Sequence, residues 1–250
     1  MTKPRFGRFF STDSAKAVKA DRFGYLNAIN YAAPHTTGGR GNYCAGASAG
    51  CKALCLGMYS GQAAMVRDIE NDINSVRASR IAKAQYFADE PQAYMDEMCF
   101  HIERLVIRAR KLGKALCVRP NGSTDIPYER IRIASRGGRT IFDVFPMVQF
   151  VDYTKRPERF DNPPANLHLT FSRSETNEAK CRAILARGHN VAAVFAGAFP
   201  ETYLGAPVIN GDEHDLRHLD PRRPGGYIVG LSPKGAKAKR DQSGFVIRAA

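Results

Sequence analysis

Cys44, Cys51 and Cys55 lie close together near the start of the chain, and the thiolate of cysteine is a strong metal ligand. Their spacing is C-x6-C-x3-C, and the whole sequence contains six cysteines. On a helical turn the four-residue step places Cys51 and Cys55 on one face, and the small residues before them let the backbone bring Cys44 back toward both. Three thiolates suit a [4Fe–4S] cluster with one open iron, or a zinc ion that takes a fourth ligand elsewhere. The alternative is three unligated thiols in a glycine-rich loop.

Polar residues follow three short apolar segments later in the chain, at 115–119, 148–153 and 167–171. In parallel sheets the chemistry lies just past the carboxyl ends of the strands. We therefore expect the following polar residues to converge at one mouth of the fold, where the cysteine loop also opens. The candidate catalytic residues are Asn121, Asp125, Asp152, Lys155, Arg173 and Glu175.

Each of these residues also has a purely structural interpretation. Asp125 follows a Gly-Ser-Thr turn, so it is also a candidate helix N-cap. Asp152 with Lys155, and Arg173 with Glu175, are the residue types that form solvent-exposed ion pairs of little energetic value. The functional interpretation makes Lys155 a contact to a substrate charge or phosphate, or an activated amine.

His214 lies in an acidic stretch and is the seventh candidate catalytic residue. Asp212, Glu213 and Asp215 surround it in the sequence and are able to orient or titrate it. We expect the segment from Asp212 to His214 to close over the site. Three further cysteines fall on apolar faces of predicted elements, where core packing is the expected role. They are Cys99, Cys117 and Cys181.

The elements that must position these residues are recognisable from hydrophobic periodicity. Strands are predicted at 25–33, 115–119, 148–153, 167–171, 191–195, 227–231 and 244–248, and helices at 63–87, 91–112, 128–135 and 177–187. Strands that alternate with helices indicate a parallel sheet. The sequence therefore predicts a single α/β domain over 1–250, built as a partial or closed (β/α) barrel. It has a cysteine loop at 34–62 and a basic extension at 217–250.

The charge balance points to a polyanionic partner. The chain carries 37 Lys and Arg against 24 Asp and Glu, a formal net charge of +13. Such a surface favours nucleic acid, with DNA as the preferred form, although a basic surface without a partner is the simpler alternative. The predicted phosphate contacts are Lys234, Lys237, Lys239 and Arg240. No apolar run is long enough to span a bilayer, and the N-terminus lacks the apolar middle of a secretory signal, so we expect a cytoplasmic protein without disulfides.

Several motifs together resemble an uncharacterised family of phage and plasmid proteins. They are the cysteine loop, RPNGSTDIPYE, VDYTKRPERF, LTFSRSE and NGDEHDLRHLD, and the resemblance covers about residues 25–245. The chain also resembles, more distantly, the gene-product-88-like proteins, which share a C-x6-C-x3-C loop, a strand ending near an acidic residue, and a later YTK strand end. The resemblance implies a mobile-element protein of the bacterial host cytoplasm that works on nucleic acid.

The early three-cysteine loop, placed before a predicted barrel, is also similar to that of radical S-adenosylmethionine enzymes. That resemblance implies an open iron that binds S-adenosylmethionine. The chain departs from their C-x3-C-x2-C spacing, and Leu54 stands where they have an aromatic residue.

Two hypotheses from different classes follow. The first is an enzyme with an iron–sulfur cluster that acts on nucleic acid or a nucleotide-derived substrate, for example in base modification. A non-radical form of it is a base transglycosylase that uses Asp125 and Asp152 as paired carboxylates. The second is a non-catalytic DNA-binding accessory protein with structural zinc. The polar strand ends favour the enzyme.

Overall fold

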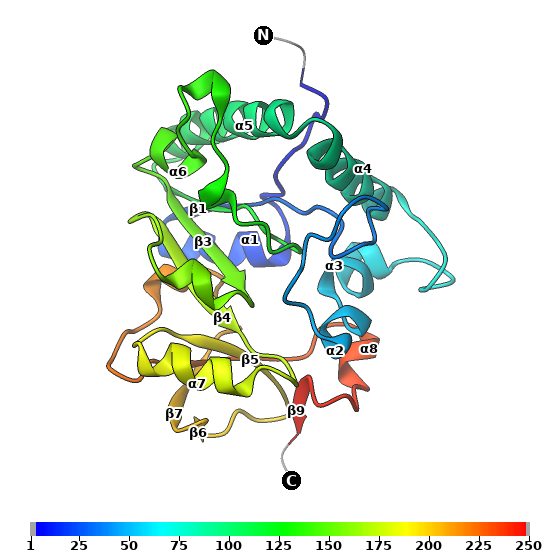
Figure 1. Cartoon of the computed structure of the whole chain (residues 1–250), viewed down its shortest axis with the longest axis vertical. Helices are drawn as coiled ribbons and strands as arrows, with labels where there is room; N and C mark the ends of the chain where they lie inside the picture. The colour runs from blue at the N-terminus through cyan, green and yellow to red at the C-terminus, as the bar shows by residue number, and fades with distance from the viewer. Residues whose placement is uncertain (1–3, 249–250) are drawn as a thin grey trace.

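A nine-stranded sheet forms the centre of residues 4–248, the part of the chain that the computed structural model describes (Figure 1). The strands are β1 (Tyr25–Ile29), β2 (Ala115–Arg119), β3 (Gln149–Thr154), β4 (Leu167–Ser172), β5 (Val191–Ala196), β6 (Thr202–Tyr203), β7 (Ala206–Asn210), β8 (Ile228–Leu231) and β9 (Val246–Arg248). The α-helices are α1 (Ala15–Lys19), α2 (Ala49–Ala53), α3 (Leu56–Tyr59), α4 (Ser75–Asp89), α5 (Pro91–Lys111), α6 (Ile141–Val144), α7 (Glu178–Ala186) and α8 (Ala236–Lys239). Short 3-10 turns are η1 (Ala20–Phe23), η2 (Gly61–Ala64), η3 (Tyr128–Arg130), η4 (Ala134–Arg136), η5 (Pro157–Phe160) and η6 (Arg217–Leu219).

The strands pair in the order β1-β2-β3-β4-β5-β8-β7-β6, and β9 also pairs with β5. The pairings are parallel except for the antiparallel contact of β6 with β7. This confirms the predicted α/β class and the parallel sheet. Within residues 4–248 no strand pairing joins β1 to β6, so the sheet is not closed by hydrogen bonds. The partial or closed barrel stays a prediction.

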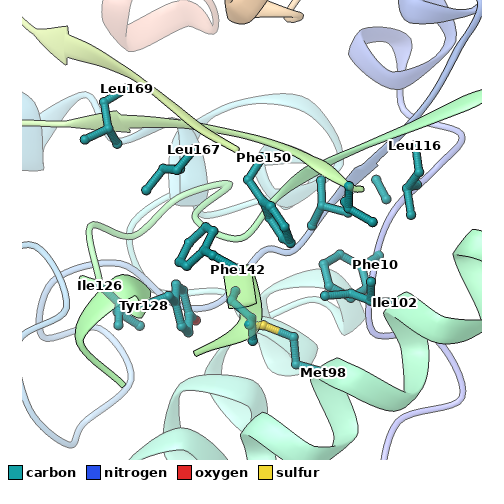
Figure 2. Packing of buried hydrophobic residues seen from close by; sticks show 14 of the residues in the cluster. Phe10, Met98, Ile102, Leu116, Ile126, Tyr128, Phe142, Phe150, Leu167 and Leu169 are labelled. Atoms are coloured by element: carbon teal, nitrogen blue, oxygen red, sulfur yellow. The ribbon is translucent and has the colours of Figure 1, made fainter. Parts of the chain in front are cut away.

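One face of the sheet carries the main apolar core, which we call the core face. Leu116, Phe150 and Leu167 alternate along β2, β3 and β4 with residues of the opposite face, as the two-residue period of a strand requires. Helix α5 covers them with Met98 and Ile102, and Figure 2 shows these side chains meeting beside Phe142. The predicted helix 91–112 and its apolar stripe are thereby confirmed.

The opposite face, which we call the back face, is covered by α1, η1 and the segment 211–222, which contains η6. Cys117, Val151 and Leu216 form a small apolar cluster there. Toward the carboxyl ends of the strands this face becomes polar, since Arg119 and Tyr153 follow Cys117 and Val151 at two-residue spacing. The sheet therefore separates an apolar side from a polar one.

The predicted helix 63–87 starts too early. Helix α4 begins at Ser75, after Asn74 accepts a hydrogen bond from the Arg77 backbone N–H at 3.0 Å. Before it, the carboxylates of Asp68 and Asp72 accept hydrogen bonds from four nearby backbone N–H groups and hold the chain in turns. Periodicity misplaced this boundary because the apolar residues of 65–73 are largely exposed, Met65 by 75%.

Two other predicted helices have different outcomes. The helix 177–187 is confirmed as α7. The segment 128–135 forms only the short turns η3 and η4.

Strand β9 joins the sheet where β4 ends. The last two residues of β4 pair with the first two of β5, Phe171 with Val191 and Ser172 with Ala192. Val194 of β5 pairs with β8 on one side and with Val246 of β9 on the other. β9 therefore takes the place of β4 beside the second half of β5.

Candidate functional site

A cavity of about 200 Å³ opens at the carboxyl ends of β2, β3, β4 and β8 and beside β5, between these strands and the cysteine loop. Its lining from the sheet side comprises Arg119, Gly122, Ser123, Thr124, Asp125, Tyr153, Thr154, Lys155, Ser172, Arg173, Ala192, Val194, Leu231, Ser232, Pro233 and Lys234. Its other walls comprise Pro34, His35, Cys44, Ala47, Cys51, Lys52, Leu54, Cys55, Leu56 and Gly57 of the loop, with Ala238, Phe245 and Val246. The three loop cysteines, Asp125, Lys155 and Arg173 thus meet at one place.

Glu175 fastens the cysteine loop to the end of β4. Its carboxylate accepts hydrogen bonds from the Ser48 hydroxyl at 2.7 Å and from the Gly50 backbone N–H at 2.8 Å. Ser48 in turn caps α2 by accepting from the Cys51 backbone N–H at 3.2 Å. The hydrogen bonds to Ser48 and Gly50 lower the pKa of Glu175 against the effect of burial. Glu175 therefore holds the loop in position, and we call this contact the Glu175 clamp. Its side chain does not line the cavity.

Glycines let the loop lie directly on the strand ends. A Cβ at Gly46 would lie 2.9 Å from the Lys155 Cβ, and one at Gly57 would lie 2.7 Å from the Ser123 Cβ. Both distances are shorter than van der Waals contact, so only glycine allows this approach. The small residues of the loop thus have a packing role that the sequence did not reveal.

The three loop cysteines line the cavity, and two of them belong to or adjoin the short helices α2 and α3. Cys51 lies in α2, Cys55 precedes α3, and the Cys44 thiol donates to the Ser123 carbonyl at 3.7 Å. Burial raises the pKa of Cys44 to about 12 and that of Cys55 to about 11. The charges of Cys55 and Cys51 raise the pKa of Cys44 further, and that of Cys51 raises the pKa of Cys55. Without a metal these two thiols are protonated at neutral pH.

Within residues 4–248, no group of three or more His, Cys, Asp or Glu side chains is already arranged closely enough to hold a metal ion. The remaining cysteines do not line the cavity. Cys99, Cys117 and Cys181 are buried, and this confirms their predicted packing role. His35 does line it, and burial lowers the pKa of this histidine, which keeps its imidazole neutral.

Asp125 and Lys155 are held together at the cavity wall. The Asp125 carboxylate accepts from the Lys155 backbone N–H at 2.9 Å and from the Arg159 guanidinium at 2.9 Å. The Lys155 ammonium donates to the Ser172 hydroxyl at 2.7 Å and lies 5.5 Å from the centre of the Phe245 ring. Asp125 does not cap a helix in this structure.

Asp152 lies below the cavity rather than in it. Its carboxylate accepts from the Asn121 amide at 2.6 Å and from Arg159 at 3.1 Å, on the core face of the sheet. Arg159 also binds Glu129, so one guanidinium serves three carboxylates. Burial raises the pKa of Asp152 to about 7. Asp152 lies in β3 and Lys155 directly follows that strand. Because side chains alternate between the two faces of a strand, residues three positions apart point to opposite faces.

The predicted catalytic residue His214 lies outside the cavity, and of the four predicted phosphate contacts only Lys234 lines it. The structure places His214 on the back face, where its ring packs on Phe23 and its carbonyl accepts from Arg217. Lys234 lines the cavity and pairs with Asp212 at 3.1 Å, while Lys237 pairs with Glu70. Lys239 and Arg240 are exposed.

Several residues that line the cavity were not predicted from the sequence. Arg119 ends an apolar strand and stacks on Tyr153 at 4.5 Å, and Phe245 enters from a segment distant in sequence. An arginine at the end of an otherwise apolar strand is a sequence pattern that could have identified Arg119 as a site residue. Phe245 gave no signal because its position depends on the pairing of β9 with β5.

The model of the gene product 88 family matches residues 8–249. The chain belongs to this family. No curated protein and no solved structure matches it. The gene product 88 resemblance inferred from the motifs is confirmed, while the similarity to radical S-adenosylmethionine enzymes stays a prediction. Among the helices of residues 4–248, none is long and apolar enough to cross a membrane.

Proposed function

We propose that this gene product 88 family member is an enzyme that acts on nucleic acid or a nucleotide-derived substrate in the cavity at the strand ends. One observation carries the proposal: the three-cysteine loop and the polar ends of separate strands line the same cavity. Packing alone does not require charged groups from several strands to share one hollow, and their desolvation is unfavourable without a ligand.

The loop cysteines are proposed to hold a metal centre, for which an iron–sulfur cluster is the first candidate and zinc the second. Cys44, Cys51 and Cys55 line one wall, and the charges of Cys51 and Cys55 both raise the pKa of Cys44, as groups within electrostatic range of it do. His35 and Asp125 line the same cavity as possible fourth ligands. Because no metal-binding group is already formed in the described residues, metal binding would bring the three thiols closer together. A cluster with an open iron supplies a binding position for S-adenosylmethionine or substrate.

In this proposal the other residues of the site bind the substrate and orient it. Lys155 presents an ammonium whose protein partner is the Ser172 hydroxyl. Asp125 fixes the backbone of Lys155 and is itself fixed by Arg159, so the two groups keep their positions when a ligand enters. The buried charges around Arg159 support the site from below.

A second candidate, base exchange without a radical, is favoured by the place of Asp125. It is the carboxylate among the described cavity-lining residues, next to Lys155. Asp152 shares Arg159 with it from the core side, and so acts on Asp125 rather than on substrate. This candidate needs Asp125 for activity but not the metal.

The metal is tested by iron, zinc and sulfide analysis of protein purified without oxygen. We expect metal in the wild type and its loss in Cys44→Ser, Cys51→Ser and Cys55→Ser, whereas Cys99→Ala keeps it. Protein with neither iron nor zinc would end the metal proposal. Zinc in the wild type, together with an Asp125→Asn variant that behaves like the wild type in every assay, would instead favour the accessory protein with structural zinc.

The nucleic-acid partner is tested by the salt dependence of binding. For duplex DNA a plot of the logarithm of the binding constant against the logarithm of the salt concentration has a negative slope. Its magnitude decreases by about 0.9 for each phosphate contact removed. Lys234 and Lys237 are engaged in ion pairs, so the exposed pair Lys239→Gln with Arg240→Gln should flatten the slope most. Lys180→Gln, exposed on α7, is the matched control. Absence of binding to DNA and RNA at low salt would contradict this partner.

A further inference from the structure

The charges that line the cavity do not balance. Five cationic side chains and one carboxylate face it: Lys52, Arg119, Lys155, Arg173, Lys234 and Asp125. Two of the cations lie within 4 Å of a carboxylate, since Lys234 pairs with Asp212 at 3.1 Å and Arg119 lies 3.9 Å from Asp215. Arg173 is within electrostatic range of Glu175, whose carboxylate is engaged by Ser48 and Gly50 outside the cavity. Asp125 is occupied by Arg159 and by the backbone of Lys155. Within residues 4–248, the ion pairs up to 4 Å include none of Lys52, Lys155 or Arg173.

Lys155 and Arg173 have hydrogen-bonding capacity to spare. An ammonium has three N–H donors, and the structure uses one of those of Lys155, toward Ser172 at 2.7 Å. Arg173 donates through one terminal nitrogen to the carbonyls of Gly244 and Phe245, the latter at 2.9 Å. Its Nε is buried and has no hydrogen-bond partner among the described residues. A buried donor without an acceptor is unfavourable, so an acceptor from a ligand is the expected complement.

We propose that Lys155, Arg173 and Ser172 form a subsite for a phosphoryl group. A phosphate monoester carries nearly two negative charges at neutral pH and three acceptor oxygens, which match two cations and a hydroxyl. A carboxylate would neutralise only one of the two cations. The Phe245 ring, 5.5 Å from the Lys155 ammonium, offers an apolar face for the rest of the ligand. This inference rests on the proposed function and narrows its substrate.

The size of the cavity limits what can carry the phosphoryl group. Its volume of about 200 Å³ is below the range of about 300–1,000 Å³ that is common for pockets of larger ligands. A duplex does not enter such a cavity. The group belongs to a free mononucleotide or to one unstacked nucleotide of a single strand.

Binding of three probes to the protein as purified tests the subsite: inorganic phosphate, a nucleoside monophosphate, and a short single-stranded oligonucleotide. Calorimetry should show phosphate and monophosphate binding, weakened at least tenfold in Lys155→Met, which keeps the side-chain stem but removes the charge. Lys180→Met, exposed on α7 outside the cavity, should bind like the wild type. If the oligonucleotide displaces the monophosphate, the group comes from a strand; if it does not, the ligand is a free nucleotide.

Two further measurements protect the test against a misfolded variant. Ser172→Ala removes one hydroxyl and should weaken phosphate binding several-fold, and phosphate should raise the melting temperature of the wild type. Equal binding by wild type and Lys155→Met, or no binding of either phosphate probe at millimolar concentration, overturns the inference. Metal analysis needs no phosphate, so loss of this subsite leaves the metal proposal standing, and loss of the metal leaves the subsite standing.

Discussion

The core face and the back face of the sheet are buried by different chemistry. On the core face, Phe150 and its neighbours pack against α5 with their side chains fully enclosed (Figure 2). On the back face, Thr170 and Arg217 are also fully buried, yet the Thr170 hydroxyl and the Arg217 Nε have no hydrogen-bond partner among the described residues. Both faces exclude water, but only the core face gains the full free energy of apolar burial from doing so.

This difference coincides with the position of the proposed site. Arg119 and Tyr153 belong to the back face and also line the cavity, so the polar layer continues into the proposed site. Arg217 pairs with Asp220 at 3.3 Å behind them. Buried ion pairs contribute little net stability compared with apolar packing. A face built this way is explained better by the site above it than by stability.

The largest expected effect is on the core face. Phe150→Ala removes a fully buried ring and leaves a cavity, so the free energy of unfolding should fall by about 3–5 kcal/mol. Urea denaturation measures it. Met147→Ala, at a side chain that is 94% exposed, is the control and should change stability by less than about 0.5 kcal/mol. A small loss at Phe150 would contradict the contrast between the two faces.

Asp152 belongs to the buried polar cluster around Arg159, the polar exception on the core face, and gives an intermediate effect. Its folded pKa is about 7, above its value of 3.8 as a free side chain, so the folded state holds the proton more tightly. Its contribution to stability is therefore complete below about pH 4 and is lost as the pH rises through about 7. Asp152→Asn stays neutral, so its stability relative to the wild type should increase across that window.

Unfolding curves of both proteins between pH 4 and pH 8 measure this difference. Asp161→Asn, at an exposed carboxylate beyond η5, is the control that removes one carboxylate outside the buried core. An Asp152→Asn offset that does not change with pH would mean that Arg159 keeps Asp152 ionised, and the core face would then bury a full negative charge.

The smallest effect is expected on the back face. Thr170→Val keeps the shape of the side chain and removes a hydroxyl that has no partner in the structure, so the free energy of unfolding should change by less than about 1 kcal/mol, in the stabilising direction. Thr140→Val is the contrast, because its hydroxyl belongs to the capping box of α6 and its loss should cost about 1 kcal/mol. A loss at Thr170 as large as that at Thr140 would show that its hydroxyl is hydrogen-bonded in solution.

The sequence predicted the core face better than the back face, for a physical reason. A helix such as 91–112 repeats its apolar residues locally, so its buried side is visible without the partner strands. The strand ends and the cysteine loop were also identified, because polar clusters after apolar runs are local features. What they contact was harder to predict. Asp152 and Lys155 were grouped by nearness in sequence, although the two-residue period turns them to opposite faces.

Other features depend on pairings between distant segments. The role of Arg159 requires three carboxylates from 125–152 to reach it, and no local pattern encodes that. The clamp of Glu175 on Gly50 likewise joins residues that are 125 positions apart. The position of Phe245 follows from β9, whose partner strand could not be deduced from composition or spacing.

The late position of β9 in the sequence has a consequence for synthesis. A ribosome makes β1 to β8 before it makes the residues that bring Phe245 and Val246 to the cavity. Until β9 docks on β5, the wall formed by Leu54, Ala238 and Val246 is incomplete. The nascent chain therefore presents its three loop thiols through an open side, and the proposed metal or ligand would have its easiest entry in the interval before the last strand is added.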